Sequence, residues 1–288
     1  MTFPHMKSAL AAVAILTAVS AQSARADSFF YAVNNFTTIE KLNGDTGVVV
    51  DSFVIPSGAG NSLSIAVVGN IGYYTQFDNT VYKVDMTTHG YLGVAFTVVG
   101  ANQQNGITTD SSGNLWLADI QHLREYTTSG TLLVDDTFPN PSNSYRDGSV
   151  VFNGMTITNR GDQQGPYDLF SLPGANGALT LVQAGFINPA INGQTTSGSN
   201  GIAFNGTNFY TSDEQAHRVT KWDINGNFVS FAALDPGSRY ENWTFASQDI
   251  VPTGGIPEPA TWAMMLVGFG GLGAVIRRRR ARSAVATA

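Results

Sequence analysis

The sequence Asn114-Leu115-Trp116-Leu117-Ala118-Asp119 decides the fold, because nearly the same arrangement returns as Asn208-Phe209-Tyr210-Thr211-Ser212-Asp213. Both segments are short and apolar, and each follows a Gly-Ile pair, at 106–107 and at 201–202. Short apolar runs bounded by turn residues are typical of buried β-strands. A strand that returns together with its flanking turn indicates a repeat architecture, so further copies must be sought before any local interpretation.

A second strand-like pattern occurs five times, and each copy begins and ends with an apolar residue. The copies lie at 39–42, 81–84, 123–126, 169–172 and 219–222. Measured at their third residues they are spaced by 42, 42, 46 and 50 positions, and a turn with glycine and a further strand-like segment follow each one. Four strands per unit of about 45 residues predict an all-β protein, specifically a β-propeller. Five four-stranded blades are favoured and six remain open.

The two ends of the repeat are incomplete in complementary ways. The first unit begins directly at the aromatic strand 29–33, whereas Gln248-Asp249-Ile250-Val251 has the form of a leading strand with nothing after it. We expect this last strand to pair into the first blade, because such an exchange closes the ring and removes exposed sheet edges. In the fourth unit we expect the leading strand at 154–157, although 159–164 offers no clear aromatic strand.

The segment 106–119, which reads Gly-Ile-x-x-Asp-x-x-Gly-Asn-Leu-Trp-Leu-Ala-Asp, resembles the six-bladed propellers of the NHL and SMP-30/gluconolactonase type. The resemblance implies a divalent metal, for instance calcium, at the mouth of the channel, held by a glutamate, an asparagine and an aspartate. Asn105 and Asn200 match that asparagine, whereas Glu40 lies inside a strand repeat. The alternative is that Asn-Gly-Ile starts an inner strand and the asparagine bonds the turn backbone.

Two repeat-equivalent pairs, Asp119 with Arg124 and Asp213 with Arg218, either brace a blade turn or form a rim that contacts a ligand. The segment Asp110 to Asn114 is interpreted as a turn, because it lacks the spaced carboxylates and the distal glutamate of a calcium loop. No Gly-x-Ser-x-Gly elbow, His-Glu-x-x-His helix or Walker loop occurs in the sequence. The commonest signals of hydrolases and nucleotide-binding proteins are therefore missing.

The N-terminus has the layout of a secretory signal peptide at 1–26. Lys7 precedes an apolar run at 9–19, and Ala24-Arg25-Ala26 is a small-x-small peptidase site, so cleavage is expected between Ala26 and Asp27. The alternative is a buried N-terminal helix. The propeller is then expected to occupy 27–253.

The C-terminus, 254–288, combines three elements in order. The motif Pro257-Glu258-Pro259-Ala260-Thr261-Trp262-Ala263 overlaps an uncharged stretch at 260–276, expected to form a short transmembrane helix, and a basic tail at 277–288 follows. Arg277, Arg278, Arg279 and Arg280 would stop transfer and hold the end on the cytoplasmic side. This ending resembles the PEP-CTERM sorting signal of Gram-negative bacteria, which implies processing by an exosortase. The alternative is an ordinary C-terminal anchor.

The formal net charge of −6 averages these basic ends with an acidic body. Between Asp27 and Pro257 there are 8 basic and 20 acidic residues, which gives about −12 for the body. A body of this sign repels a phosphate backbone, which argues against nucleic acid as a partner. The absence of cysteine excludes a disulfide scaffold and a thiol nucleophile.

Two function classes follow from the sequence. The favoured one is an exported binding protein without enzymatic activity, anchored first in the inner membrane with its body in the periplasm and later found at the cell surface or in the extracellular matrix. Its expected partners are an exosortase, the inner membrane at least transiently, and an envelope polysaccharide or protein. The alternative is a metal-dependent, lactonase-like hydrolase that uses Asn105 and Asn200.

Overall fold

The computed structural model describes residues 29–56, 62–76, 78–98, 100, 106–139, 148–159, 166–174, 176–189, 201–213 and 216–245. Every helix or strand position assigned in these ranges belongs to a β-strand, so the described part of the chain is all-β. None of these ranges contains a helix that is long and apolar enough to cross a membrane. The expected signal peptide, the sorting segment, Asn105 and Asn200 lie outside the described residues.

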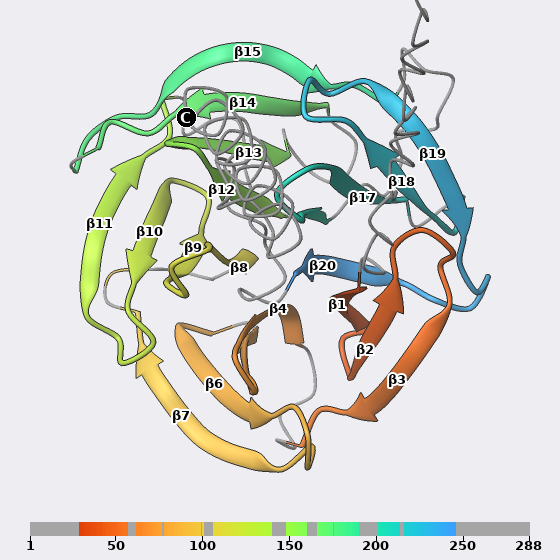
Figure 1. Ribbon diagram of the computed structural model, residues 1–288. Helices are drawn as coiled ribbons and strands as arrows, with labels where there is room; N and C mark the ends of the chain where they lie inside the picture. The colour runs from red at the N-terminus through yellow and green to blue at the C-terminus, as the bar shows by residue number, and fades with distance from the viewer. Residues whose placement is uncertain are drawn as a thin grey trace, which may run out of the picture.

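Twenty strands form five four-stranded antiparallel sheets, arranged as the blades of a ring (Figure 1). This confirms the expected five-bladed propeller. Blade 1 contains β20 (Tyr240–Thr244), β1 (Phe29–Asn34), β2 (Thr38–Asn43) and β3 (Val49–Val54). Blade 2 contains β4 (Ser62–Val68), β5 (Ile71–Gln76), β6 (Thr80–Asp85) and β7 (Tyr91–Thr97). Blade 3 contains β8 (Gly106–Thr109), β9 (Leu115–Ala118), β10 (His122–Tyr126) and β11 (Leu132–Thr137).

The remaining two blades follow the same order from the axis outward. Blade 4 contains β12 (Ser149–Phe152), β13 (Met155–Asn159), β14 (Tyr167–Ser171) and β15 (Thr180–Ile187). Blade 5 contains β16 (Ile202–Phe204), β17 (Phe209–Asp213), β18 (Arg218–Trp222) and β19 (Phe228–Ala233). The five recurring segments found in the sequence fall on β2, β6, β10, β14 and β18, the third strand of each blade.

The ring closes by the expected strand exchange, but through a different segment. β20 pairs antiparallel with β1, with Thr244 opposite Tyr31 and Trp243 opposite Ala32. The prediction that 248–251 supplies this strand was wrong, because β20 takes the innermost place of blade 1. The reason is the pattern of aromatic residues: Tyr240 and Trp243 are 2% and 0% exposed, so this segment brings the larger apolar side chains to the closure.

Blade 4 also differs from the expectation. Residues 154–157 were expected to form the leading strand of this blade. They instead lie at the start of the second strand, Met155–Asn159, and Ser149–Phe152 is the leading strand. The two strands are joined by Asn153 and Gly154, whose φ angles of 48° and 70° are those of a tight hairpin turn. An Asn-Gly pair between apolar runs is a strong hairpin signal, and it marked this boundary in the sequence.

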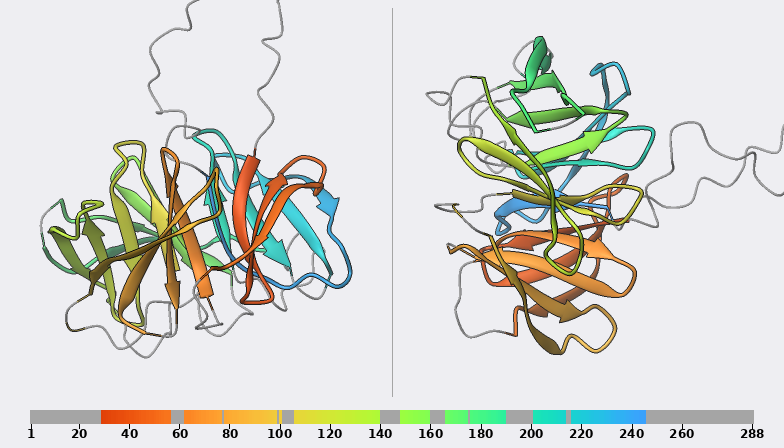
Figure 2. Two further views of the ribbon diagram at one scale, coloured as in Figure 1. Left: turned by 90° about the horizontal axis from the view of Figure 1, so that it is seen from below. Right: turned by 90° about the vertical axis from the view of Figure 1, so that its left-hand side faces the viewer.

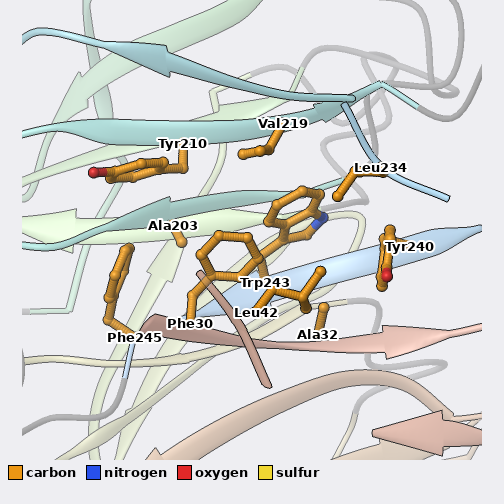
Figure 3. Close-up of a cluster of buried hydrophobic side chains, with 10 residues drawn as sticks. All are labelled: Phe30, Ala32, Leu42, Ala203, Tyr210, Val219, Leu234, Tyr240, Trp243 and Phe245. Atoms are coloured by element: carbon orange, nitrogen blue, oxygen red, sulfur yellow. The ribbon is translucent and has the colours of Figure 1, made fainter. Parts of the chain in front are cut away.

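The core is divided into five apolar clusters, one at each contact between neighbouring blades. The cluster between blades 5 and 1 surrounds Trp243 (Figure 3). The rings of Phe30 and Trp243 lie 4.4 Å apart between centroids, and Phe245 approaches Phe30 edge-on at 5.8 Å. The ring of Phe30 also lies 6.2 Å from that of Tyr210 in blade 5, so aromatic side chains connect these two blades.

The antiparallel order gives the ring two different faces (Figure 2). We call the hairpin face the one at which the first strand of a blade turns into the second and the third into the fourth. The opposite crossover face carries the links from second to third strand and from blade to blade. In blade 1 the place of the first turn is taken by the end of β20 and the start of β1, because Thr244 pairs with Tyr31. Both ends of the described chain therefore leave from the hairpin face.

Candidate functional site

Polar side chains of three inner strands form hydrogen bonds between blades. Asn242 Nδ2 donates a hydrogen bond of 2.8 Å to Ser64 Oγ, which itself donates to the carbonyl of Ile107 at 3.1 Å. Thr108 Oγ1 lies 3.5 Å from Thr244 Oγ1. These contacts join β20, β4 and β8, so neutral hydroxyl and amide groups link the inner strands of three of the five blades.

The strands next to the two candidate asparagines are tightly held. A Cβ on Gly106 would lie 3.1 Å from Asn242 Nδ2, so β8 begins in close contact with β20. In blade 5, the Gly201 amide donates to Ser212 Oγ at 3.0 Å, and the Gly201 carbonyl accepts from Tyr167 Oη at 2.9 Å. Since Asn105 and Asn200 lie outside the described residues, their role at the mouth of the channel stays a prediction. The described ranges hold no group of three His, Asp or Glu side chains arranged for a metal ion.

The two Asp–Arg pairs brace turns between the second and third strands, as one of the two interpretations expected. Arg124 Nη1 lies 2.6 Å from Asp119 Oδ2, and Asp119 Oδ1 accepts the amides of Gln121 and His122. Arg218 Nη2 lies 3.2 Å from Asp213 Oδ2. Because Arg124 is only 3% exposed, this pair is part of the blade interior.

The turn interpretation of Asp110 to Asn114 is also confirmed. Asp110 Oδ1 accepts the amides of Ser112 and Asn114 at 2.8 and 3.1 Å. Its other oxygen, Oδ2, accepts the indole N–H of Trp116 at 3.0 Å. Both carboxylate oxygens therefore stabilise the hairpin between β8 and β9.

A buried carboxylate that the sequence did not single out as a site lies beside the closing strand. Glu40 Oε1 accepts from Asn34 Nδ2 at 3.0 Å, and Glu40 Oε2 accepts from Tyr240 Oη at 2.6 Å. Burial and this hydrogen bond raise the pKa of Tyr240 well above its usual value, so the phenol remains a donor. The sequence around Glu40 does not indicate this hydrogen bond, because Tyr240 lies 200 positions further along the chain.

Large apolar side chains are exposed along the outer strands, Val50, Val54, Val94 and Phe231 among them, and two stand at the start of every outer strand. Directly after each turn from the third to the fourth strand, two consecutive apolar residues have exposed fractions between 37% and 57%. We call these ten residues the apolar crown: 48–49, 91–92, 132–133, 181–182 and 228–229. Consecutive strand residues point to opposite sides, so neither side of the outer strand is covered there. Because the crown follows the third-to-fourth turns, it lies at the hairpin face.

Few charged side chains are exposed on the described surface as a whole. Among the charged residues whose side chains the structure describes, only Asp45, Asp51 and Asp235 are exposed. Asp45 accepts from Lys221 Nζ of blade 5. The described surface is therefore dominated by neutral polar and apolar groups, and large exposed apolar areas mark sites of interaction.

Comparison with known proteins identifies the C-terminal segment. Residues 255–280 match the PEP-CTERM protein-sorting motif. The motif indicates a secreted, membrane-anchored precursor that is sorted to the cell surface, and it implies an exosortase as the processing enzyme. No curated protein gave a significant match.

Solved structures resemble the body in fold alone. A structure described as the nidogen/laminin complex aligns with a TM-score of 0.52 and 12% identity, over 77% of this chain and 99% of the other. A protein of unknown function from Bacteroides caccae aligns with a TM-score of 0.46 and 12% identity, over 72% of this chain and 73% of the other. A streptogramin B lyase aligns with a TM-score of 0.43 and 14% identity, over 75% and 68%.

Proposed function

We propose that the protein is a non-enzymatic binding protein of the cell surface or the extracellular matrix, which an exosortase releases from or re-attaches to the envelope. The observation that carries the proposal is the sorting motif at 255–280 on a chain whose body is a repeat propeller. In the precursor, the signal peptide would be cleaved after Ala26. The uncharged stretch 260–276 would cross the inner membrane, with Arg277 to Arg280 in the cytoplasm and the propeller in the periplasm.

The crossover face is the proposed binding face, since both chain ends leave from the hairpin face. Several segments that link one blade to the next, or the second strand to the third, are rich in Asn, Gln, Ser and Thr; they include 101–105, 140–147 and 190–200. Amide and hydroxyl groups offer both donors and acceptors without charge. This chemistry suits a neutral envelope polysaccharide, with a surface protein as the second class of ligand.

Binding assays with the purified protein test this proposal. We expect the protein to bind an envelope or matrix polysaccharide, and we expect replacement of Thr196, Ser197 and Ser199 by alanine in a crossover link to lower the affinity. The matched control replaces Ser111 and Ser112, which are exposed on the hairpin face, and should bind as the wild type does.

Two results would contradict the proposal. One is failure to bind any envelope polysaccharide or protein in glycan arrays and pull-downs. The other is metal-dependent turnover of a lactone that Asn105→Ala and Asn200→Ala abolish, because this would show that the propeller is an enzyme.

A further inference from the structure

We propose that the apolar crown docks the hairpin face of the propeller on the phospholipid bilayer in which the C-terminal segment is anchored. The membrane would then hold the precursor at its end and also support one whole face of the ring. This role is separate from ligand binding at the crossover face.

The tether between the propeller and the membrane leaves from the hairpin face. The described chain ends with Phe245 at the hairpin face, and the matched sorting motif begins at residue 255. The uncharged stretch proposed to cross the membrane begins at 260, so the fourteen residues 246–259 span at most about 50 Å even when fully extended. The chain therefore continues toward the membrane from the hairpin face, whereas the crossover face lies on the opposite side of the ring.

The crown has the apolar chemistry of a surface that binds lipid. Each blade contributes two exposed apolar residues, for example Leu132 and Leu133 at 47% and 45% exposure. Moving such side chains from water into the boundary between headgroups and acyl chains is favourable. Five equivalent contacts around a ring fit a laterally uniform apolar layer, whereas a folded protein partner would have to present five matching sites.

The turns of the hairpin face carry negative charge. The carboxylates of Asp85, Asp110 and Asp223 lie in hairpin-face turns, where backbone amides hold them. The hydrogen bonds from the amides of Thr88 and Thr87 lower the pKa of Asp85, so this group stays negative. A negative hairpin face is repelled by anionic lipids, so the expected surface is a zwitterionic bilayer.

The full-length precursor in nanodiscs tests this docking. Because the chain has no cysteine, Leu133→Cys places a single environment-sensitive fluorophore on the crown. Gln121→Cys, an exposed position of the same blade at the crossover face, is the matched control. We expect the probe at 133 to shift to shorter wavelength and to be quenched by brominated acyl chains, whereas the probe at 121 remains unaffected.

A crown variant gives a second readout. Replacing Leu181 and Val182 with aspartate in the 133-labelled protein should reduce the docked fraction roughly tenfold, which corresponds to the loss of two partly buried apolar side chains. Circular dichroism confirms that the variant is folded. Raising the share of anionic lipid should also reduce the docked fraction.

Three results would overturn the inference. The first is equal solvent exposure of both probes in zwitterionic nanodiscs, because the propeller would then stand off the bilayer. The second is docking that requires anionic lipid. The third is protection of the probe at 133 that rises with protein concentration in the absence of lipid, because the crown would then bind a second copy of the chain.

Discussion

Blades 1 and 4 close their inner pair of strands in opposite ways. In blade 4 the chain itself makes the connection, through Asn153 and Gly154 between β12 and β13. In blade 1 the strands β20 and β1 come from opposite ends of the described chain, and no turn joins them. Side chains hold this seam: Trp243 packs on Phe30 and Tyr240 bonds to Glu40.

The difference shows where the stability of the ring is concentrated. A turn keeps two strands close even when individual side-chain contacts are lost, because the loop that must be closed is short. The pair β20 and β1, which we call the seam, has no turn and depends on its side-chain and backbone contacts alone. We therefore expect substitutions at the seam to have larger effects than equivalent substitutions in blade 4.

The largest expected effect is that of Trp243→Ala. Trp243 is fully buried in the cluster between blades 5 and 1, so the substitution leaves a large cavity and should lower the free energy of unfolding by about 3–5 kcal/mol. Urea unfolding measures the change. A loss no larger than that of Phe228→Ala, on an exposed outer strand, would show that the seam does not limit stability.

Tyr240→Phe should have the next largest effect. The substitution keeps the aromatic side chain but removes the hydroxyl that donates to Glu40. A buried carboxylate oxygen then has one partner fewer, which should lower the free energy of unfolding by about 1–3 kcal/mol. The raised pKa of Tyr240 means that the wild type loses this contribution as the pH rises above 10.0, and the variant should lack that loss. Tyr91→Phe, at an exposed position, is the control and should leave the unfolding curve unchanged.

Gly154→Ala tests the turn that joins β12 and β13 in blade 4. The φ of Gly154 is 70°, which an L-residue adopts only with strain, so a cost of about 1 kcal/mol is expected. Nothing lies within 4 Å of the position that the new Cβ would take, so the effect comes from the backbone alone. An effect on thermal unfolding as large as that of Trp243→Ala would reverse the comparison between the blades.

The smallest effect, and one of opposite sign, is expected for Asp136→Asn. Burial raises the pKa of Asp136, and its Oδ2 has no hydrogen-bond partner in the described structure. A raised carboxyl pKa adds stability that is fully present below the unfolded value of 3.8 and is lost as the pH rises through the folded value. The variant should therefore be more stable at neutral pH, by up to about 1 kcal/mol, and this gain should shrink in acid.

Chemical unfolding over a pH series measures the Asp136 effect. Asp235→Asn serves as the control, because Asp235 is exposed, and it should change stability little. A gain for Asp136→Asn that persists unchanged in acid would contradict the link to the carboxyl charge.

The repeat could be predicted from the sequence because each blade places apolar residues at the same points of the same strands. The third strands, the turn at Asp110 and the braces of Arg124 and Arg218 all follow from contacts within one blade. The position of the closing strand was missed, because 248–251 fits the local pattern while the contacts that select 240–244 lie far away in sequence. The pairing of Glu40 with Tyr240 was hidden for the same reason.

The exposure of the crown could not be predicted either. Segments such as Leu132-Leu133 have the composition of buried strands, and only the assembled ring shows that no neighbouring blade covers them. The sorting motif, in contrast, was recognisable because its residues are contiguous and act as a linear signal.

The strand exchange also sets the order of events during export. In export led by the proposed N-terminal signal peptide, β1 would emerge early and wait for β20, which is encoded about two hundred residues later. Until then the first blade lacks its innermost strand and offers a free edge. The sorting motif begins only eleven positions after Thr244. The strand that completes the ring would therefore cross the membrane only shortly before the sorting signal reaches it. The ring would have little time to close before the chain is anchored.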